Sequence, residues 1–308
     1  MPKHFITLQS IKYIFTAVTF FVFGFFLFNY YKDFYIIRNI STLQLIAISL
    51  LILFGVTING SKLNRIAINF GIQLRLGEWL ALSSMTTVLN SLFFKAGSMA
   101  TSSYLKKKYS FPYSSFAGTF LGDQLIILFI GALTGSIVCL HLGLSGHQKL
   151  LFICAGFALT AALLFFLMRG RIGLPQKGST IFDLLRRGIE SFNMLLSNKS
   201  LLYFLGFHNI FLIITIGLRF YMACSILHVE VPLSHCLLFA TIAIFARIIP
   251  LTHNDIGLRE LSVGFLSGVL GSGLKAGVLA TVVDRIFELL WTILCTGFFR
   301  NFLVTPKG

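Results

Sequence analysis

The stretch RIIPLTHNDIGLRELSVGF, residues 247–265, interrupts an apolar chain with two arginines, an aspartate and a glutamate. The segments on either side, CLLFATIAIFA (236–246) and LSGVLGSGLKAGVLATVV (266–283), carry a single charge between them. An arginine at the centre of a membrane helix costs about 2.5–3.5 kcal/mol on insertion scales. Charges of this kind therefore indicate a polar site inside the protein, if the surrounding segments lie in a membrane.

The composition indicates that they do. The chain has 308 residues, of which 56% are hydrophobic and 11% charged, with a mean hydropathy of +0.87. Soluble domains carry about 25% charged residues. Uncharged runs at 13–31, 40–61 and 150–168 are about as long as the 20 or so helical residues that a bilayer core requires. The sequence predicts an all-α polytopic membrane protein, and bilayer lipid is its first expected partner.

We expect about six full spans, near 12–31, 41–60, 112–140, 150–168, 200–223 and 275–299. Two further regions, 79–108 and 231–271, are apolar but broken by polar and helix-ending residues, so each half is too short to cross. Paired half-segments of this kind are typical of re-entrant helical hairpins. Two amphipathic stretches are also expected as helices, one interfacial at 61–79 and one in the large loop at 182–196.

The two broken regions resemble each other. Asp123 follows the break at Gly97 by 26 residues, and Asp284 follows the break at Gly257 by 27. We therefore predict an inverted-topology repeat, an arrangement common in transporters, whose substrates bind at the repeat interface. The expected organisation is a single membrane domain, residues 1–308. It consists of repeat 1 at about 61–140, linker spans and a cytoplasmic loop at about 150–199, and repeat 2 at about 200–300.

The net charge of +15 is concentrated in alternate loops. By the positive-inside rule these loops are cytoplasmic, which places both termini inside a cell membrane, plasma or inner, and predicts a multi-pass topology. The charge is therefore interpreted as a topology signal, and no nucleic-acid partner is expected. The five cysteines lack metal-ligand spacing, and we expect neither a metal nor a cofactor.

The interrupted stretch suggests how a phosphate would bind. A helix starting near Ile256 would present free N–H groups within the membrane, and an arginine in its first turn binds phosphate bidentately. The predicted phosphate-binding residues are Asn254, Asp255, Ile256, Gly257, Arg259 and Arg285. The predicted supporting ion network is Arg247, Glu260, Asp284, Glu288 and Asp123, and the apex of the first hairpin is Lys95, Gly97 and Ser98. The alternative is that these charges form a purely structural network. Arg219, near the end of its span, is expected to snorkel to the interface.

The same stretch carries a family resemblance. The pattern P-x-x-x-G-G-x-G-x-R-E followed by a later arginine is matched by Pro250, Gly257, Arg259, Glu260 and Arg285, with Asn254 and Asp255 in place of two glycines. Over about 10–300 the chain resembles the lysylphosphatidylglycerol synthase transmembrane-region family of flippase-like proteins. The resemblance implies movement of an amphiphilic lipid between leaflets, either an anionic or aminoacylated phospholipid or a polyprenyl-phosphate-linked lipid. With nine residues after the last expected span, no aminoacyl-transferase domain is expected.

Three functional hypotheses follow. The first is a lipid flippase or transporter, which is not an enzyme. The second is a membrane-embedded enzyme that modifies lipid headgroups, although the sequence lacks the acidic loop motifs of membrane glycosyltransferases. The third is a non-catalytic membrane subunit of an envelope-assembly complex. A homo-oligomer or envelope-biosynthesis proteins are the protein partners considered.

Overall fold

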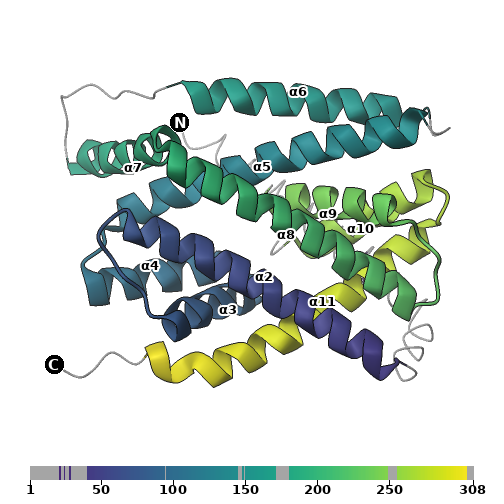
Figure 1. Ribbon diagram of the computed structural model, residues 1–308, viewed down its shortest axis with the longest axis horizontal. Coiled ribbons are helices and arrows are strands. Elements are labelled where there is room, and N and C mark those ends of the chain that lie inside the picture. Colours follow the sequence, from purple (N-terminus) through teal and green to yellow (C-terminus); the bar gives the residue numbers. More distant parts are fainter. Residues whose placement is uncertain are drawn as a thin grey trace.

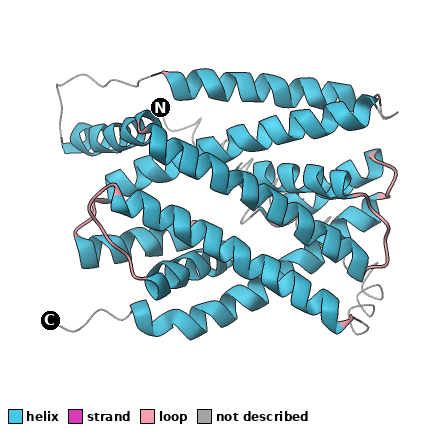
Figure 2. Cartoon of the chain, viewed as in Figure 1, coloured by secondary structure: helices cyan, strands magenta, loops and turns pink. Residues whose placement is uncertain are grey.

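The computed structural model describes residues 21, 24, 28, 40–93, 95–144, 148, 150–170, 180–248 and 255–303 (Figure 1). In this part of the chain all regular structure is helical, as Figure 2 shows. The helices are α2 Thr42–Ile68, α3 Leu76–Leu92, α4 Ala96–Tyr109, α5 Tyr113–Leu144, α6 Leu150–Arg169, α7 Thr180–Ser197, α8 Lys199–Ile226, α9 Leu233–Ile248, α10 Leu258–Val269, α11 Leu274–Phe299 and the short 3-10 helix η3 Arg300–Leu303. The all-α prediction is confirmed.

Four of the described helices, α2, α5, α6 and α8, are long and apolar enough to cross a membrane. Large apolar side chains such as Phe152 and Phe166 of α6 point outward, where a bilayer would solvate them. The expected span at 275–299 corresponds to α11, which has 26 residues but carries Asp284, Arg285 and Glu288 within its length. The expected span at 12–31 lies outside the described residues, apart from three helical positions.

The first broken region forms a helical hairpin. Helices α3 and α4 pack together, and at the break Lys95 adopts a left-handed conformation with φ 56°. Asn90 of α3 accepts hydrogen bonds from the backbone N–H groups of Gly97 and Ser98 at 2.9 and 3.3 Å, and so caps α4. At the open end, Tyr109 of α4 donates to the Glu78 carboxylate near the start of α3. With 17 and 14 residues, each helix is shorter than the 20 or so that a bilayer crossing requires.

The second broken region forms the corresponding pair, α9 and α10, with 16 and 12 residues. Its break at 249–254 lies outside the described residues. Helix α10 begins after Gly257 and turns back through Gly271 and Gly273, both at positive φ, into α11. Each broken region therefore forms two short helices, and one long helix follows it.

The predicted interfacial helix at 61–79 is wrong. Helix α2 continues without interruption through Ile68, and a loop then leads to α3 at Leu76. The helix passes through Lys62 because that side chain is buried and paired inside the protein, so the charge does not mark the membrane surface. The amphipathic prediction at 182–196 corresponds to α7, which buries Phe192 and Leu195 and packs on α5.

Helices α2 and α8 cross the centre of the molecule side by side and antiparallel. Gln44 at the start of α2 bonds Ser225 near the end of α8, and Asn69 just after α2 bonds Asn198 just before α8. Around this pair, α3 packs on α11 and α9 packs on α5. The chain thus contains two segments of four helices, α2–α5 and α8–α11. In each segment, the second helix packs on the last helix of the other segment.

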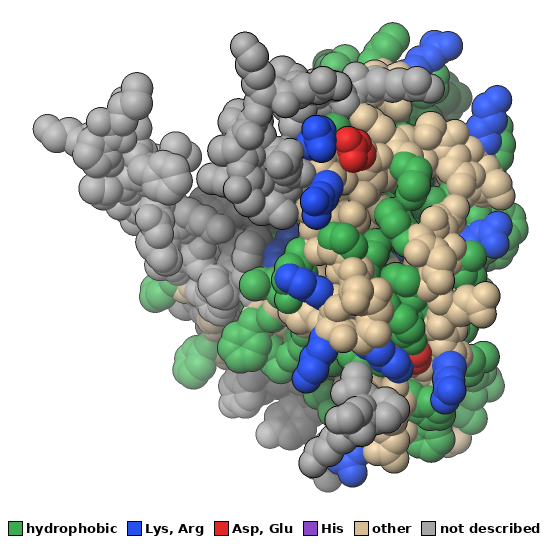
Figure 3. Space-filling model, turned by 90° about the vertical axis from the view of Figure 1, so that its left-hand side faces the viewer, with side chains coloured by type: hydrophobic (Ala, Val, Ile, Leu, Met, Phe, Trp, Pro, Cys, Tyr) green, Lys and Arg blue, Asp and Glu red, His purple; other side chains and the backbone are tan. Residues whose placement is uncertain are grey.

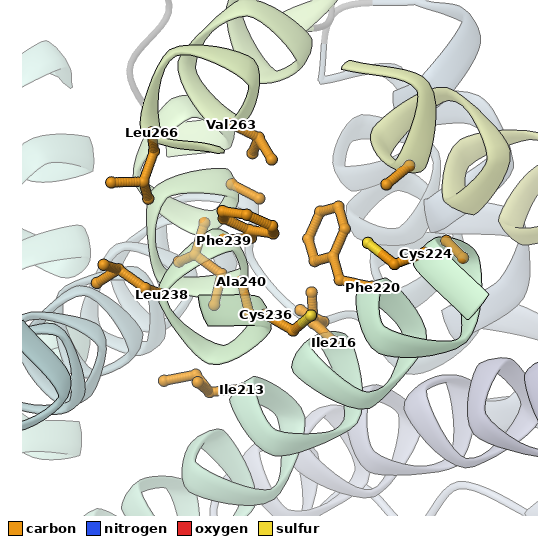
Figure 4. Close-up of a cluster of buried hydrophobic side chains, with 14 of the residues drawn as sticks. Ile213, Ile216, Phe220, Cys224, Cys236, Leu238, Phe239, Ala240, Val263 and Leu266 are labelled. Carbon is orange, nitrogen blue, oxygen red and sulfur yellow. The ribbon is translucent and has the colours of Figure 1, made fainter. Parts of the chain in front are cut away.

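An apolar cluster of buried side chains joins α8 to α9 and α10 (Figure 4). The rings of Phe220 and Phe239 meet edge to face, with centroids 6.1 Å apart, and Val263 of α10 is fully buried beside them. Burial of an aromatic or branched aliphatic side chain stabilises a fold by about 1.5–3 kcal/mol. This cluster therefore fixes the position of α10 and the charged residues at its start.

One end of the molecule is basic. The ends of α4 and α6, the exposed face of α7 and the starts of α8 and η3 lie together at the left of Figure 1. Figure 3 shows this end, on which Lys and Arg side chains greatly outnumber Asp and Glu. The basic residues of these elements are Lys106, Lys107, Lys108, Arg169, Arg186, Arg187, Lys199 and Arg300. The basic loops that the sequence assigns to one side of the membrane are therefore together in space.

Candidate functional site

A cavity of about 260 Å³ lies between the two four-helix segments. Side chains of α2, α3, α4 and α5 line one part of it, and residues at the end of α9, the start of α10 and the middle of α11 line the other. Both hairpin apices contribute, through Lys95 and Ser98 in the first and Asp255 in the second. A water molecule occupies about 30 Å³ in the liquid, so the space suits several waters or a small polar group.

The α8–α11 part of the wall is built on a shared ion network. Arg259 is 2% exposed, and its Nη2 lies 2.5 Å from the Asp284 carboxylate. Arg219 of α8 binds the other oxygen of Asp284 at 2.7 Å and Glu288 at 2.9 Å. Arg247, at the end of α9, makes a longer 3.4 Å contact with Glu288. Three guanidinium groups therefore share two carboxylates, and the network retains one positive charge.

A second cluster holds the start of α10. Arg285 of α11 contacts Asp255 at 3.2 Å and Glu260 at 3.0 Å. The backbone N–H of Gly257 donates to Glu260 at 2.7 Å, so this carboxylate also caps the helix. Gly257 has φ 81°, a conformation that a residue without a Cβ adopts without strain. The sequence places glycine here because the chain must turn sharply into α10.

A third ion pair lies on the α2–α5 side. Lys62 donates to Asp123 of α5 at 2.9 Å and to the side-chain oxygen of Asn209 of α8 at 2.7 Å. Lys62 and Asp123 are 4% and 9% exposed, and Asn209 is fully buried. Buried charges are stable only when paired and hydrogen-bonded, a condition that this trio meets.

Besides Lys95 and apolar side chains such as Phe116 and Phe120, that side of the cavity carries a group of uncharged polar side chains. The hydroxyls of Thr86 and Thr101 are hydrogen-bonded at 2.6 Å across the α3–α4 hairpin. Asn90, Ser98 and Gln124 line the same surface. The cavity therefore has several guanidinium groups on the side of one four-helix segment, and hydroxyl and amide groups beside one ion pair and Lys95 on the side of the other.

The model of one protein family, described as the lysylphosphatidylglycerol synthase TM region, matches residues 9–297, nearly the whole chain. The chain belongs to this family. No curated protein and no solved structure matches it. Membership in a membrane-protein family agrees with the four apolar helices, so the chain is a multi-pass membrane protein.

In this family member, part of the predicted supporting ion network is present. The ion pairs of Arg259 with Asp284 and of Arg247 with Glu288 are both present. Asp255, predicted as a phosphate-binding residue, pairs with Arg285. Of the predicted phosphate-binding residues, Ile256 lies at the cavity end of α10, and Asn254 lies outside the described residues.

Two further expectations differ from the structure. Arg219 does not snorkel, because its side chain is 5% exposed and bound to both carboxylates of α11. Asp123 does not join the arginine network, because its carboxylate accepts hydrogen bonds from Lys62 and Asn209. Sequence reasoning missed Lys62 and Asn209. The available signal was a lysine directly after an uncharged run and an asparagine in the middle of an apolar span.

The three arginines of the network differ in accessibility. The side chain of Arg247 is 48% exposed, whereas those of Arg219 and Arg259 are 5% and 3% exposed. The closest ion-pair contact of Arg247, at 3.4 Å, is also longer than the closest contacts of Arg219 and Arg259, at 2.7 and 2.5 Å. It is therefore the guanidinium that a molecule entering the cavity reaches first.

Proposed function

We propose that this protein moves a lipid with an anionic headgroup between the leaflets of a membrane, without chemical change to the lipid. The headgroup occupies the cavity between the two four-helix segments while the acyl chains remain in the bilayer. The observation that carries the proposal is this cavity of about 260 Å³, lined in part by charged and hydrogen-bonding side chains, inside an apolar multi-pass protein. Only the headgroup then loses its water, and cavity groups replace that water.

The charge of the cavity favours an anion. Six basic and five acidic described side chains line it or lie directly behind its wall, which leaves one positive charge. The basic residues are Lys62, Lys95, Arg219, Arg247, Arg259 and Arg285, and the acidic residues are Asp123, Asp255, Glu260, Asp284 and Glu288. Phosphate is a good match because guanidinium groups bind it bidentately.

We assign the first phosphate contact to Arg247. Its 3.4 Å contact with Glu288 is long, and its exposed side chain can exchange that carboxylate for a phosphate. Arg259 and Arg285 lie deeper on the same wall and supply positive potential behind it. We thus propose that Arg259 shares with Arg247 the phosphate-binding role that the sequence assigned to Arg259.

The architecture supports alternating access. Segments α2–α5 and α8–α11 have the same order of elements, and their first helices run antiparallel, so we infer two inverted repeats with α3–α4 and α9–α10 as re-entrant hairpins. Inverted repeats place transporter substrates at their interface, and the cavity lies there. We also infer that the basic end of the molecule is cytoplasmic, with both termini inside.

Reconstitution into liposomes tests the function. Acyl-labelled fluorescent phosphatidylglycerol is distributed over both leaflets, and an impermeant quencher then measures how much reaches the outside. With active protein, quenching should exceed the roughly half expected for protein-free vesicles. Arg247→Gln should lower the rate about tenfold or more with an unchanged melting temperature, and Arg186→Gln on the exposed face of α7 is the matched control. Wild-type vesicles that behave like empty ones would refute the proposal.

A further inference from the structure

The two four-helix segments share one pair of charges at matching positions. Lys62 lies 20 residues after the start of α2, and Arg219 lies 20 residues after the start of α8. Asp123 and Asp284 each lie 10 residues after the start of α5 and α11. In both segments the cation of the first helix binds the acid of the last helix, at 2.9 Å and 2.7 Å. These two ion pairs align the α2–α5 segment with the α8–α11 segment, so that other positions can be compared between them.

At other corresponding positions, charges occur in only one segment. Arg247 is the fifteenth residue of α9, and the fifteenth residue of α3 is Asn90. Arg285 directly follows Asp284, whereas Gln124 directly follows Asp123. The side chains of Arg247, Asn90, Arg285 and Gln124 all line the cavity. At these two positions a neutral amide therefore faces the cavity from one side, and a guanidinium faces it from the other.

We propose that the neutral wall, built by Thr86, Asn90, Ser98, Thr101 and Gln124, binds an uncharged hydroxyl-bearing part of the headgroup. The substrate class is then a phospholipid whose phosphate carries a polyol such as glycerol, inositol or a sugar. This inference rests on the proposed function and names the substrate class of the same site. The phosphate lies toward Arg247, and the polyol lies toward the α3–α4 hairpin.

The hydrogen-bonding groups of the neutral wall suit a polyol. Hydroxyl and amide side chains both donate and accept, as sugar hydroxyls do. Thr86 and Thr101 bond each other at 2.6 Å, which leaves one hydroxyl proton and several lone pairs for a ligand. The side-chain oxygen of Asn90 accepts from the N–H groups of Gly97 and Ser98, and its amide nitrogen donates to the Ser98 hydroxyl at 3.5 Å, which leaves one amide N–H for a ligand.

The same wall disfavours an ammonium group. Among the described residues of the α2–α5 side of the cavity, the one carboxylate is Asp123, and Lys62 and Asn209 already bind it. Lys62 and Lys95 add positive charge nearby. A headgroup carrying an aminoacyl amine would lose its hydration there without gaining a counterion, at a cost that paired sites avoid. The aminoacylated substrate that the sequence left open is therefore not the one proposed.

The test removes hydroxyls without changing shape. Thr86→Val combined with Thr101→Val replaces both partners of one hydrogen bond by apolar groups, a change that is nearly neutral for stability. Thr57→Val, on the exposed side of α2, is the matched control. The probes are acyl-labelled phosphatidylinositol, phosphatidic acid and lysyl-phosphatidylglycerol in the same vesicles. We expect wild-type protein to translocate phosphatidylinositol at least tenfold faster than the lysylated lipid, and the double variant to lose most of that rate while its phosphatidic acid rate stays within twofold.

Equal losses for phosphatidylinositol and phosphatidic acid, no loss for either, or fastest movement of the lysylated lipid would overturn the inference. A second measurement separates it from the transport proposal. In detergent, inositol 1-phosphate should raise the melting temperature of the wild-type protein more than inorganic phosphate does, and the double variant should lose that difference. Binding with this pattern in a protein that moves no lipid would refute the proposed function and leave the polyol site standing. Equal effects of the two anions on the wild-type protein would refute the polyol site.

Discussion

Arg259 illustrates how a buried charge serves structure and function together. Its guanidinium lies over the Phe220 ring at 5.6 Å while it binds Asp284, so it ties α10 to both α8 and α11. The apolar cluster around Phe220 and Phe239 also holds α10, against α8 and α9. The position therefore belongs to the fold as well as to the proposed phosphate site.

Arg259→Ala should destabilise the protein, because it removes one of the two cations that neutralise Asp284. Removing one partner of a buried ion pair costs about 3–5 kcal/mol. A drop in melting temperature of several degrees in detergent, measured against Arg247→Gln as the accessible member of the network, is the expected result. Unchanged stability of Arg259→Ala would show that Arg219 alone satisfies the carboxylate.

Lys62 and Asp123 offer a sharper residue-level test. Lys62→Met should destabilise strongly because it leaves a buried carboxylate with only Asn209 as its partner, again by about 3–5 kcal/mol. Adding Asp123→Leu removes that carboxylate and should restore most of the lost stability. Thermal unfolding of wild type, both single variants and the double variant gives the coupling free energy. If the double variant is no more stable than Lys62→Met, the pair is not the source of the loss.

At the scale of elements, the open end of the α3–α4 hairpin is held by one carboxylate. Glu78 accepts hydrogen bonds from Tyr104, Tyr109 and Lys108, all in the last turns of α4. Burial raises the pKa of Glu78, but these hydrogen bonds outweigh burial and hold its pKa below the ordinary value of 4.5. Burial and the bond to Glu78 also raise the pKa of Tyr109 to about 12.

The depressed pKa of Glu78 predicts an acid sensitivity. A carboxylate whose pKa is lower in the folded state contributes stability that is present above 4.5 and is lost as the pH falls through the folded-state value. We expect the melting temperature of the wild type to fall between about pH 6 and about pH 3 by more than that of Glu78→Gln. Parallel curves for the two proteins would show that Glu78 does not stabilise the hairpin.

At the scale of the whole molecule, the arrangement of basic residues predicts an orientation. Lys107 lies at the basic end, and Glu230 lies beyond α8 at the opposite end; both are exposed. Single cysteines at these positions, on a background without the five native cysteines, should react differently with an impermeant thiol reagent in intact cells. Position 230 should be labelled and position 107 protected until the membrane is permeabilised. The reverse pattern would place the basic end outside.

The sequence determined the class of this protein, because apolar runs of span length have few stable structures other than membrane helices. It also located both hairpins, since short apolar halves around Gly97 and Gly257 depend only on local chain properties. Charge signs and helical spacing made Asp284 and Glu288 candidate partners of Arg259 or Arg247, without deciding between the pairings. These features depend on residues that are close in the sequence or on composition.

Only the tertiary structure decided which charges meet. Lys62 and Asp123 are 61 residues apart, and Arg219 and Asp284 are 65 apart, so their contacts depend on how α2, α5, α8 and α11 cross. Each cation alone was compatible with the membrane surface, and only burial against a partner distinguishes Arg219 from a snorkelling arginine. The contrast between the guanidinium groups on one side of the cavity and the amide and hydroxyl groups on the other likewise arises where two distant segments face each other, because a cavity is a property of packed helices.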